Sequence, residues 1–138
     1  MTENAEGKTT GTTPGNQPIC YGVVGLGRMG ALHLDVLKTL EPRVKVCALS
    51  DTDPKRLRQA KKMFPAAEAL TDYKNMAGRV EAVSICTPTE THCAIAEYFL
   101  ENKIAALVEK PIASNLTEAE KILWASQATQ TVSGPAGP

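Results

Sequence analysis

A glycine-rich segment from residue 25 to residue 30 has the G-x-G-x-x-G spacing of loops that hold the pyrophosphate of a dinucleotide. Gly25 permits a tight turn, Gly27 leaves no Cβ in the path of the pyrophosphate, and Gly30 lets the following helix pack closely on the preceding strand. Unpaired N–H groups at the start of that helix attract phosphate. On its own the segment also fits a simple glycine-rich turn, so its surroundings must decide. The candidate cofactor-binding residues here are Gly25, Leu26, Gly27, Arg28, Met29 and Gly30.

Asp51 is the next candidate cofactor-binding residue, because it follows an apolar run and lies twenty-one residues after Gly30. A carboxylate at this spacing accepts hydrogen bonds from both hydroxyls of an adenosine ribose. Its charge would repel a 2′-phosphate, so the sequence favours NAD over NADP. Lys55 and Arg56 lie close enough in the sequence to keep NADP as an alternative. Asp51 could also serve only as a helix cap, a role that we assign to Asp53.

Thr87, Pro88 and His92 belong to a loop that follows a later apolar run, residues 83–86. Ligands of open α/β sheets bind outside the carboxyl ends of the strands, so this loop should border the cofactor. We therefore add these three residues to the candidate cofactor-binding set. The pKa class of its side chain would also allow His92 a catalytic role. A histidine in a first helical turn is more often structural, and we interpret His33 on the first helix as structural too.

Glu109 and Lys110 follow the last buried apolar run and precede Pro111. A Glu–Lys pair at a strand end is usually a solvated ion pair. Here both side chains would project over the same crevice as the glycine loop. An ammonium group there can hold a substrate hydroxyl beside a nicotinamide and ease its deprotonation as hydride leaves. We expect Lys110 to be catalytic and Glu109 and Lys110 to border the cofactor. Pro111 fixes the chain direction, and its peptide isomer stays open.

The elements that must position these residues alternate between strand and helix. We expect strands over residues 19–24, 44–49, 83–86 and 104–108, and an extended piece over 67–70. We expect helices over residues 28–40, after the Asp53-Pro54 pair, over 72–76, over 91–102 and after Thr117. Because parallel strands need crossover connections, this alternation predicts an α/β fold, a doubly wound parallel sheet with helices on both faces.

Two local patterns give further expectations. Thr117 with Glu120 three residues later is a capping box, which starts the last helix at this point. Helical spacing on the first helix predicts a core-facing stripe made of Met29, Leu32, Val36, Leu37 and Leu40.

The charge balance argues against one class of partner. The 138 residues carry 15 Lys and Arg against 15 Asp and Glu, whereas a nucleic-acid-binding protein needs clustered surplus basic charge. No apolar stretch reaches the length of a membrane span and no secretory signal is present, so we expect a cytoplasmic protein that binds no membrane. The cysteines show no metal-site spacing, so we expect reduced thiols and no metal site.

The two ends of the chain differ in composition from its middle. Residues 1–18 contain no Val, Ile, Leu or aromatic residue, which predicts a disordered tail. Residues 131–138 (TVSGPAGP) predict a loose C-terminal end. The dinucleotide-binding domain is therefore expected over residues 19–130.

The motifs together resemble the amino-terminal domain of the glucose–fructose oxidoreductase, inositol dehydrogenase and MocA family. The resemblance runs from about residue 20 to residue 125, and the Glu109-Lys110-Pro111 triplet is its specific part. It implies a Rossmann-type domain of an NAD(P)-dependent oxidoreductase that transfers hydride between a nicotinamide and a hydroxyl of a sugar, sugar nucleotide or polyol. By the same resemblance, Lys110 is the catalytic residue of this domain, and Glu109 and the Thr87-Pro88 loop line the nicotinamide end.

The resemblance also implies what is missing from the 138 residues. Family members continue into a sixth strand and a substrate-binding domain, so we expect a sheet that is incomplete at its C-terminal end, no substrate domain and no turnover by this chain alone. Residues 103–106 (KIAA) depart from the Gly-Lys-His-Val usual before the last strand. The segment VEKPIASNLTEAEKIL most resembles the nucleotide-sugar 3-dehydrogenase branch.

Three alternatives remain beside the dehydrogenase hypothesis. The chain could be a stand-alone dinucleotide-binding sensor or one subunit of a split enzyme. A methyltransferase also uses a glycine-rich first loop and an acidic second strand end. That assignment would leave Gly30 and the Glu109-Lys110-Pro111 triplet unexplained.

Overall fold

The computed structural model describes residues 17–136 and confirms a doubly wound, all-parallel α/β fold. One sheet has the strand order β3-β2-β1-β4-β5-β6. The strands are β1 (Ile19–Val24), β2 (Val44–Ser50), β3 (Glu68–Leu70), β4 (Ala82–Ile85), β5 (Ala105–Val108) and β6 (Ser133–Pro135). β1 pairs with both β2 and β4, so the direction of winding reverses beside it. The carboxyl ends of β1 and β4 therefore form the switch point where open α/β sheets bind ligands.

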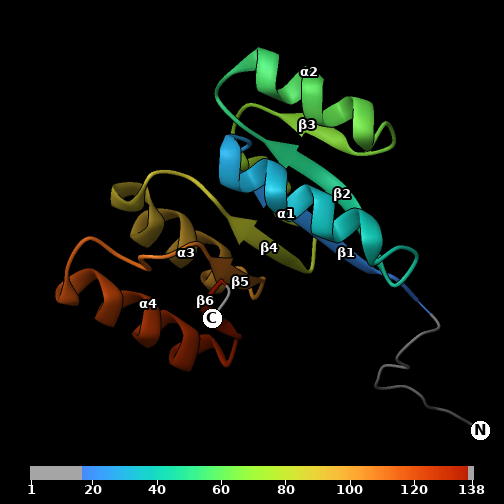
Figure 1. The fold of residues 1–138 in the computed structure, drawn as a ribbon. Helices are drawn as coiled ribbons and strands as arrows, with labels where there is room; N and C mark the ends of the chain where they lie inside the picture. The colour runs from blue at the N-terminus through green and yellow to red at the C-terminus, as the bar shows by residue number, and fades with distance from the viewer. Residues whose placement is uncertain (1–16, 137–138) are drawn as a thin grey trace, which may run out of the picture.

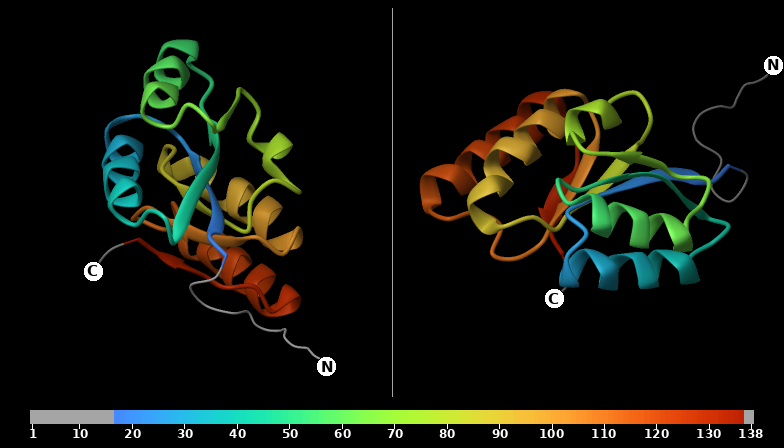
Figure 2. Two further views of the ribbon diagram at one scale, coloured as in Figure 1. Left: turned by 90° about the vertical axis from the view of Figure 1, so that its right-hand side faces the viewer. Right: turned by 90° about the horizontal axis from the view of Figure 1, so that it is seen from above.

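Helices cover both faces of the sheet, as Figure 1 and the view from above in Figure 2 show. α1 (Arg28–Thr39) and α2 (Pro54–Met63) lie on one face, and α3 (His92–Glu101) and α4 (Leu116–Thr129) lie on the other. Two short 3-10 turns, η2 (Tyr73–Met76) and η3 (Thr89–Thr91), precede β4 and α3. Within residues 17–136, none of the helices combines the length and apolar character needed to cross a bilayer.

Each face of the sheet has its own core, because successive strand residues point to opposite sides. Val23 of β1 is fully buried among residues of α1 and α2, and its neighbour Val24 belongs to the core under α3 and α4. Phe99 of α3 and Ile122 of α4 close that second core against β4 and β5. The sheet is thus held rigidly between two layers, which fixes the ends of β1, β4 and β5 relative to one another.

The buried face of α1 differs from the predicted stripe. Leu37 is buried as expected, but Met29, Leu32 and Val36 are exposed, whereas Leu34 is buried. The correction has a local cause at Gly30, where the helix touches the backbone of the turn before it. That contact turns the face carrying Gly30, Leu34 and Leu37 toward the sheet. The spacing of apolar residues does not predict this rotation of the helix.

The last helix begins one residue before Thr117, so the predicted capping box is wrong. Asn115 is the N-cap, and its side chain accepts a hydrogen bond from the Glu118 N–H at 2.9 Å. The Glu118 carboxylate in turn accepts from Ser114 N at 3.3 Å. The other predicted cap is confirmed, because Asp53 accepts from Lys55 N at the start of α2.

The expectation of a loose C-terminal end and a missing sixth strand is corrected by β6. Ala106 N donates to Val132 O at 3.0 Å, and Ala136 N donates to Val108 O at 2.7 Å. The strand needs little apolar sequence because it lies at the sheet edge, and Pro135 falls at a position whose nitrogen does not face β5. The predicted tail lies almost entirely outside the described residues, as do residues 137–138.

Candidate cofactor-binding site

Gly25 and Gly30 hold β1, the turn and α1 together by direct backbone contact. Gly25 has φ +91°, and a Cβ placed there would lie 2.7 Å from the carbonyl carbon of Cys86. A Cβ placed on Gly30 would lie 1.9 Å from the carbonyl oxygen of Gly25. Both positions therefore require glycine, one for its positive φ and backbone contact and the other for the closeness of strand and helix. This is the packing that the G-x-G-x-x-G spacing predicts.

Gly27 differs from the other two glycines because the space beside it is open. The nearest atom to a Cβ placed there is the tip of the flexible Arg56 side chain, at 3.4 Å. Gly27 is also the N-cap of α1, and no side chain caps this helix end. The N–H groups of Arg28, Met29 and Gly30, in the first turn, thus stand at a helix start that can receive an anion.

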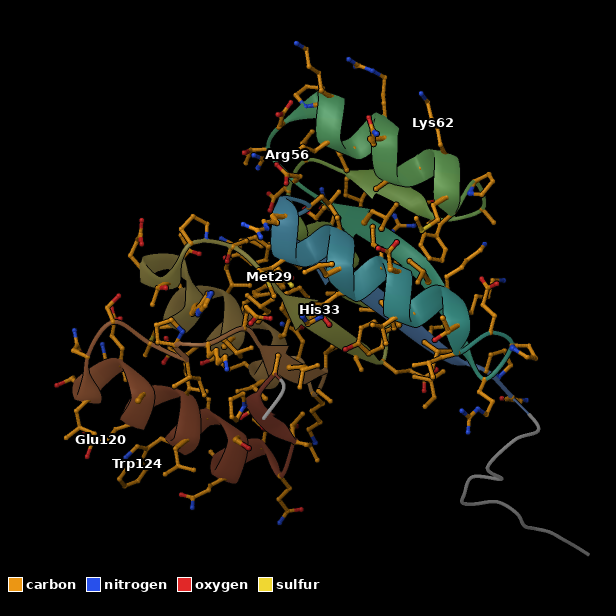
Figure 3. The ribbon with its side chains drawn as sticks, in the orientation of Figure 1. Met29, His33, Arg56, Lys62, Glu120 and Trp124 are labelled. Atoms are coloured by element: carbon orange, nitrogen blue, oxygen red, sulfur yellow. The ribbon has the colours of Figure 1, made fainter. Side chains whose placement is uncertain are left out.

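Asp51 follows β2 and ties the glycine loop to the second strand. Its Oδ2 accepts from Leu26 N at 2.7 Å, and its Oδ1 accepts from Asp53 N at 2.8 Å. The carboxylate side chain is only 8% exposed, with the Arg56 guanidinium 3.9 Å away. Figure 3 shows Arg56 at the start of α2, beside the start of α1. The sequence places Asp51 correctly at the loop but does not reveal that it already binds two backbone amides.

The loop after β4 reaches the same edge of the sheet. Cys86 N donates to Val24 O at 2.7 Å, which continues the β1–β4 pairing up to Thr87 and Pro88. The Thr91 hydroxyl lies 2.6 Å from both the Thr87 hydroxyl and the Pro88 carbonyl oxygen. These bonds fold the loop back on itself directly next to Gly25, whose backbone it contacts.

The buried side chain of His92 contacts the backbone of the loop after β4. The side chain is 1% exposed, with Nε2 2.8 Å from Thr87 O and Nδ1 3.0 Å from Pro111 O. Both ring nitrogens thus face backbone carbonyl groups, and the burial argues against direct contact of the imidazole with a nucleotide or substrate. His92 instead connects the loop after β4 to the loop after β5.

Glu109 and Lys110 follow β5 at this edge and face different surroundings. The Glu109 Oε2 atom is 2.8 Å from His33 Nε2, and the two side chains are 13% and 15% exposed. Lys110 is exposed, and its peptide bond to Pro111 is cis. Lys110 thus lies at the surface of this loop, whereas the Glu109 carboxylate is turned toward α1.

A family model described as "Oxidoreductase family, NAD-binding Rossmann fold" matches residues 19–134. The chain belongs to this family. The match runs from β1 into β6, so the described sheet is an NAD-binding Rossmann domain, and the resemblance inferred from the sequence is confirmed.

Several relatives of this Rossmann domain are dehydrogenases. The chain is 42% identical over 99 residues to 1-carboxy-3-chloro-3,4-dihydroxycyclohexa-1,5-diene dehydrogenase of Comamonas testosteroni, a match that covers 70% of this chain and 25% of that protein. It is 29% identical over 111 residues to UDP-N-acetylglucosamine 3-dehydrogenase of Acidithiobacillus ferrooxidans, covering 77% and 33%. The chain thus spans about a quarter to a third of the length of the curated relatives it matches.

A solved relative supports the same assignment. The structure of scyllo-inositol dehydrogenase from Lactobacillus casei with bound cofactor NAD(H) and scyllo-inositol superposes with a TM-score of 0.80 at 26% identity. The superposition covers 86% of this chain and 36% of that one.

The Rossmann domain has the features that a dinucleotide requires. The uncapped start of α1 and the open space beside Gly27 suit a pyrophosphate, and the Asp51 carboxylate at the end of β2 suits a ribose. The candidate residues for holding the cofactor are therefore the glycine loop, Asp51 and the loops after β4 and β5.

Sequence reasoning missed the polar chain that supports Glu109. His33 Nδ1 lies 2.9 Å from the Ser84 hydroxyl, which lies 2.8 Å from the Tyr21 hydroxyl. One signal could have pointed to it, since His33 follows Gly30 by three residues and so shares the sheet-facing side of α1. Ser84 is also the polar residue inside an otherwise apolar strand.

Cys86 should be an unusually unreactive thiol. Burial, with a smaller contribution from the Glu109 charge, raises the pKa of the Cys86 thiol from 9.0 to about 12. Because the thiolate is the nucleophile, we expect alkylation at pH 8 to be about a thousandfold slower in the native chain than in the unfolded one, and to quicken as pH rises. Mass spectrometry of the Cys86 peptide after iodoacetamide treatment in EDTA measures this ratio. Equal rates in buffer and in urea would contradict it.

Proposed function

We propose that this chain binds NAD(H) as the nucleotide domain of a cytoplasmic dehydrogenase that oxidises a ring hydroxyl of a polyol, sugar or sugar nucleotide. The observation that carries the proposal is the meeting of the glycine loop, Asp51 and Lys110 at one carboxyl edge of the sheet. The names of the relatives add the substrate class, because a cyclohexadiene diol, scyllo-inositol and N-acetylglucosamine are all six-membered rings that carry hydroxyl groups.

The residues of the domain have distinct proposed roles. Asp51 selects a ribose with free hydroxyls, and the first turn of α1 binds the pyrophosphate. The nicotinamide, when bound, supplies the hydride acceptor. Lys110 presents an exposed ammonium group beside it, which holds the substrate hydroxyl and lowers the barrier to its deprotonation. The remaining substrate contacts come from the part of the enzyme beyond this domain.

The proposal is tested by titrating the chain calorimetrically with NAD(H) and with NADP(H). We expect one binding site that prefers NAD(H). In Asp51→Ala, we expect NAD(H) affinity to fall about tenfold to a hundredfold, the range for hydrogen bonds to a charged group. The preference over NADP(H) should shrink as well, because the repelling carboxylate is gone while Arg56 remains 3.4 Å from the Gly27 Cβ position.

Asp72→Ala is the matched control, because Asp72 is also a capping aspartate but caps η2, which precedes β4. We expect its nucleotide affinities to equal those of the unmodified chain. The absence of any heat with either nucleotide at millimolar concentration would refute nucleotide binding. An unchanged NAD-to-NADP preference in Asp51→Ala would refute the ribose contact alone.

A further inference from the structure

Three potential metal ligands lie together behind the nucleotide-binding edge. They are the side chains of His33 on α1, Cys86 after β4 and Glu109 after β5, and their ligand atoms all lie within 4.8 Å of one another. All three side chains are partly buried rather than solvated. The cluster draws on three separate elements, so no local spacing in the sequence reveals it.

The histidine of this cluster is oriented by a partner on each ring nitrogen, one a carboxylate and the other a hydroxyl. His33 Nε2 lies 2.8 Å from Glu109 Oε2, and His33 Nδ1 lies 2.9 Å from the Ser84 hydroxyl. Ser84 is 1% exposed and is itself 2.8 Å from the Tyr21 hydroxyl. Metal-binding histidines typically have their second nitrogen held in this way, which fixes the ring and directs the first nitrogen at the metal. His33 is thus both close to the other two side chains and held in the orientation typical of a metal-binding histidine.

We propose that His33 Nε2, Cys86 Sγ and Glu109 bind a zinc ion. Nitrogen, sulfur and a carboxylate oxygen form a donor set that suits zinc, whereas magnesium and calcium prefer oxygen alone. Zinc–ligand distances of about 2.0–2.3 Å place tetrahedral neighbours roughly 3.5 Å apart, so side-chain shifts of about an ångström complete the set. The fourth position is open to water.

Charge and protons balance at such a site. Zinc displaces the thiol proton of Cys86 to solvent, and the resulting thiolate and the Glu109 carboxylate together neutralise the two positive charges of the ion. The His33 ring binds through one nitrogen and donates the proton on its other nitrogen to Ser84. The proposal does not depend on nucleotide binding, because every ligand belongs to the chain itself.

Cys86 distinguishes this site from a simple His33–Glu109 ion pair, so the test follows the thiolate. The untagged, reduced full chain is titrated with cobalt(II), a spectroscopic substitute for zinc. We expect one ion per chain, a thiolate-to-cobalt charge-transfer band and the visible bands of tetrahedral cobalt, all abolished by one equivalent of zinc. Cys86→Ser should lose the charge-transfer band, and Cys47→Ser, which removes a thiol from β2, should retain it.

Two further variants keep the test decisive. Glu109→Gln preserves size and an acceptor for His33 but removes the charge, and we expect its zinc affinity to fall by at least about tenfold. Ser84→Ala should lower the zinc affinity by about tenfold, although all three ligand residues remain in the chain. A band that survives in Cys86→Ser, or the same zinc affinity in Glu109→Gln as in the unmodified chain, would overturn the proposal. If Cys86→Ser loses its folded circular dichroism spectrum, Glu109→Gln decides.

Discussion

Replacing Gly30 with alanine should unfold this domain or reduce its stability by at least about 3 kcal/mol, and with it abolish NAD(H) binding. The added Cβ would lie 1.9 Å from the carbonyl oxygen of Gly25. That oxygen belongs to the backbone of the turn, so no side-chain rotation can relieve the overlap. The helix must instead move away from β1, and its first turn then leaves the position at which it meets the pyrophosphate. Urea unfolding followed by circular dichroism measures the loss of stability. Calorimetric titration with NAD(H), under conditions where the variant is folded, measures the loss of binding.

Gly134→Ala is the matched control for this prediction. Gly134 lies in β6, and no heavy atom lies within 4 Å of a Cβ placed there. We expect the free energy of unfolding to change by no more than about 0.5 kcal/mol, with NAD(H) affinity unchanged. A Gly30→Ala chain as stable as Gly134→Ala would show that the turn does not need the close backbone contact.

In the proposed dehydrogenase, Lys110→Ala should reduce turnover by about 10²–10⁴-fold, the range typical for removal of a general acid or base. Lys110 is exposed at the end of β5 and belongs to the loop that His92 fixes through Pro111. If its ammonium group acts on the substrate hydroxyl, kcat falls while the NAD(H) affinity of the domain stays within about twofold. Steady-state kinetics of the whole enzyme and calorimetry of this chain separate the two effects.

Lys62→Ala provides the comparison, because Lys62 points away from the sheet on the outer side of α2 (Figure 3). We expect no change in either quantity. An enzyme that keeps its turnover without Lys110 would refute the catalytic role, and one that loses NAD(H) affinity in proportion would make Lys110 a cofactor contact instead.

The sequence predicts the parts of this domain that depend on neighbours along the chain. The alternation of apolar runs and helical spacing gives the parallel sheet, and the G-x-G-x-x-G spacing with Asp51 gives the nucleotide edge. The face of α1 was predicted wrongly because the Gly25–Gly30 contact, rather than the apolar pattern, sets the rotation of the helix. β6 was missed because its pairing to β5 rests on backbone groups rather than on apolar side chains, and Pro135 falls where no N–H is needed.

The polar interior of the site lay beyond sequence reasoning for a different physical reason. His33 and Glu109 are 76 residues apart and meet at 2.8 Å only because α1 packs over β1 and β4, and β5 pairs with β4 in the same sheet. Cys86 joins them through the register of β4. Such contacts depend on the relative placement of whole elements, which no local spacing encodes.

The ring of His92 has a mechanical consequence for this edge of the sheet. It sits between the Thr87 carbonyl group, in the loop after β4, and the Pro111 carbonyl group, in the loop after β5 that contains Lys110. Because the ring is buried and touches both, a shift of either loop must break a contact to the ring or move the ring with it. A displacement of the Thr87 loop would therefore disturb the contact to Pro111, the residue that follows Lys110.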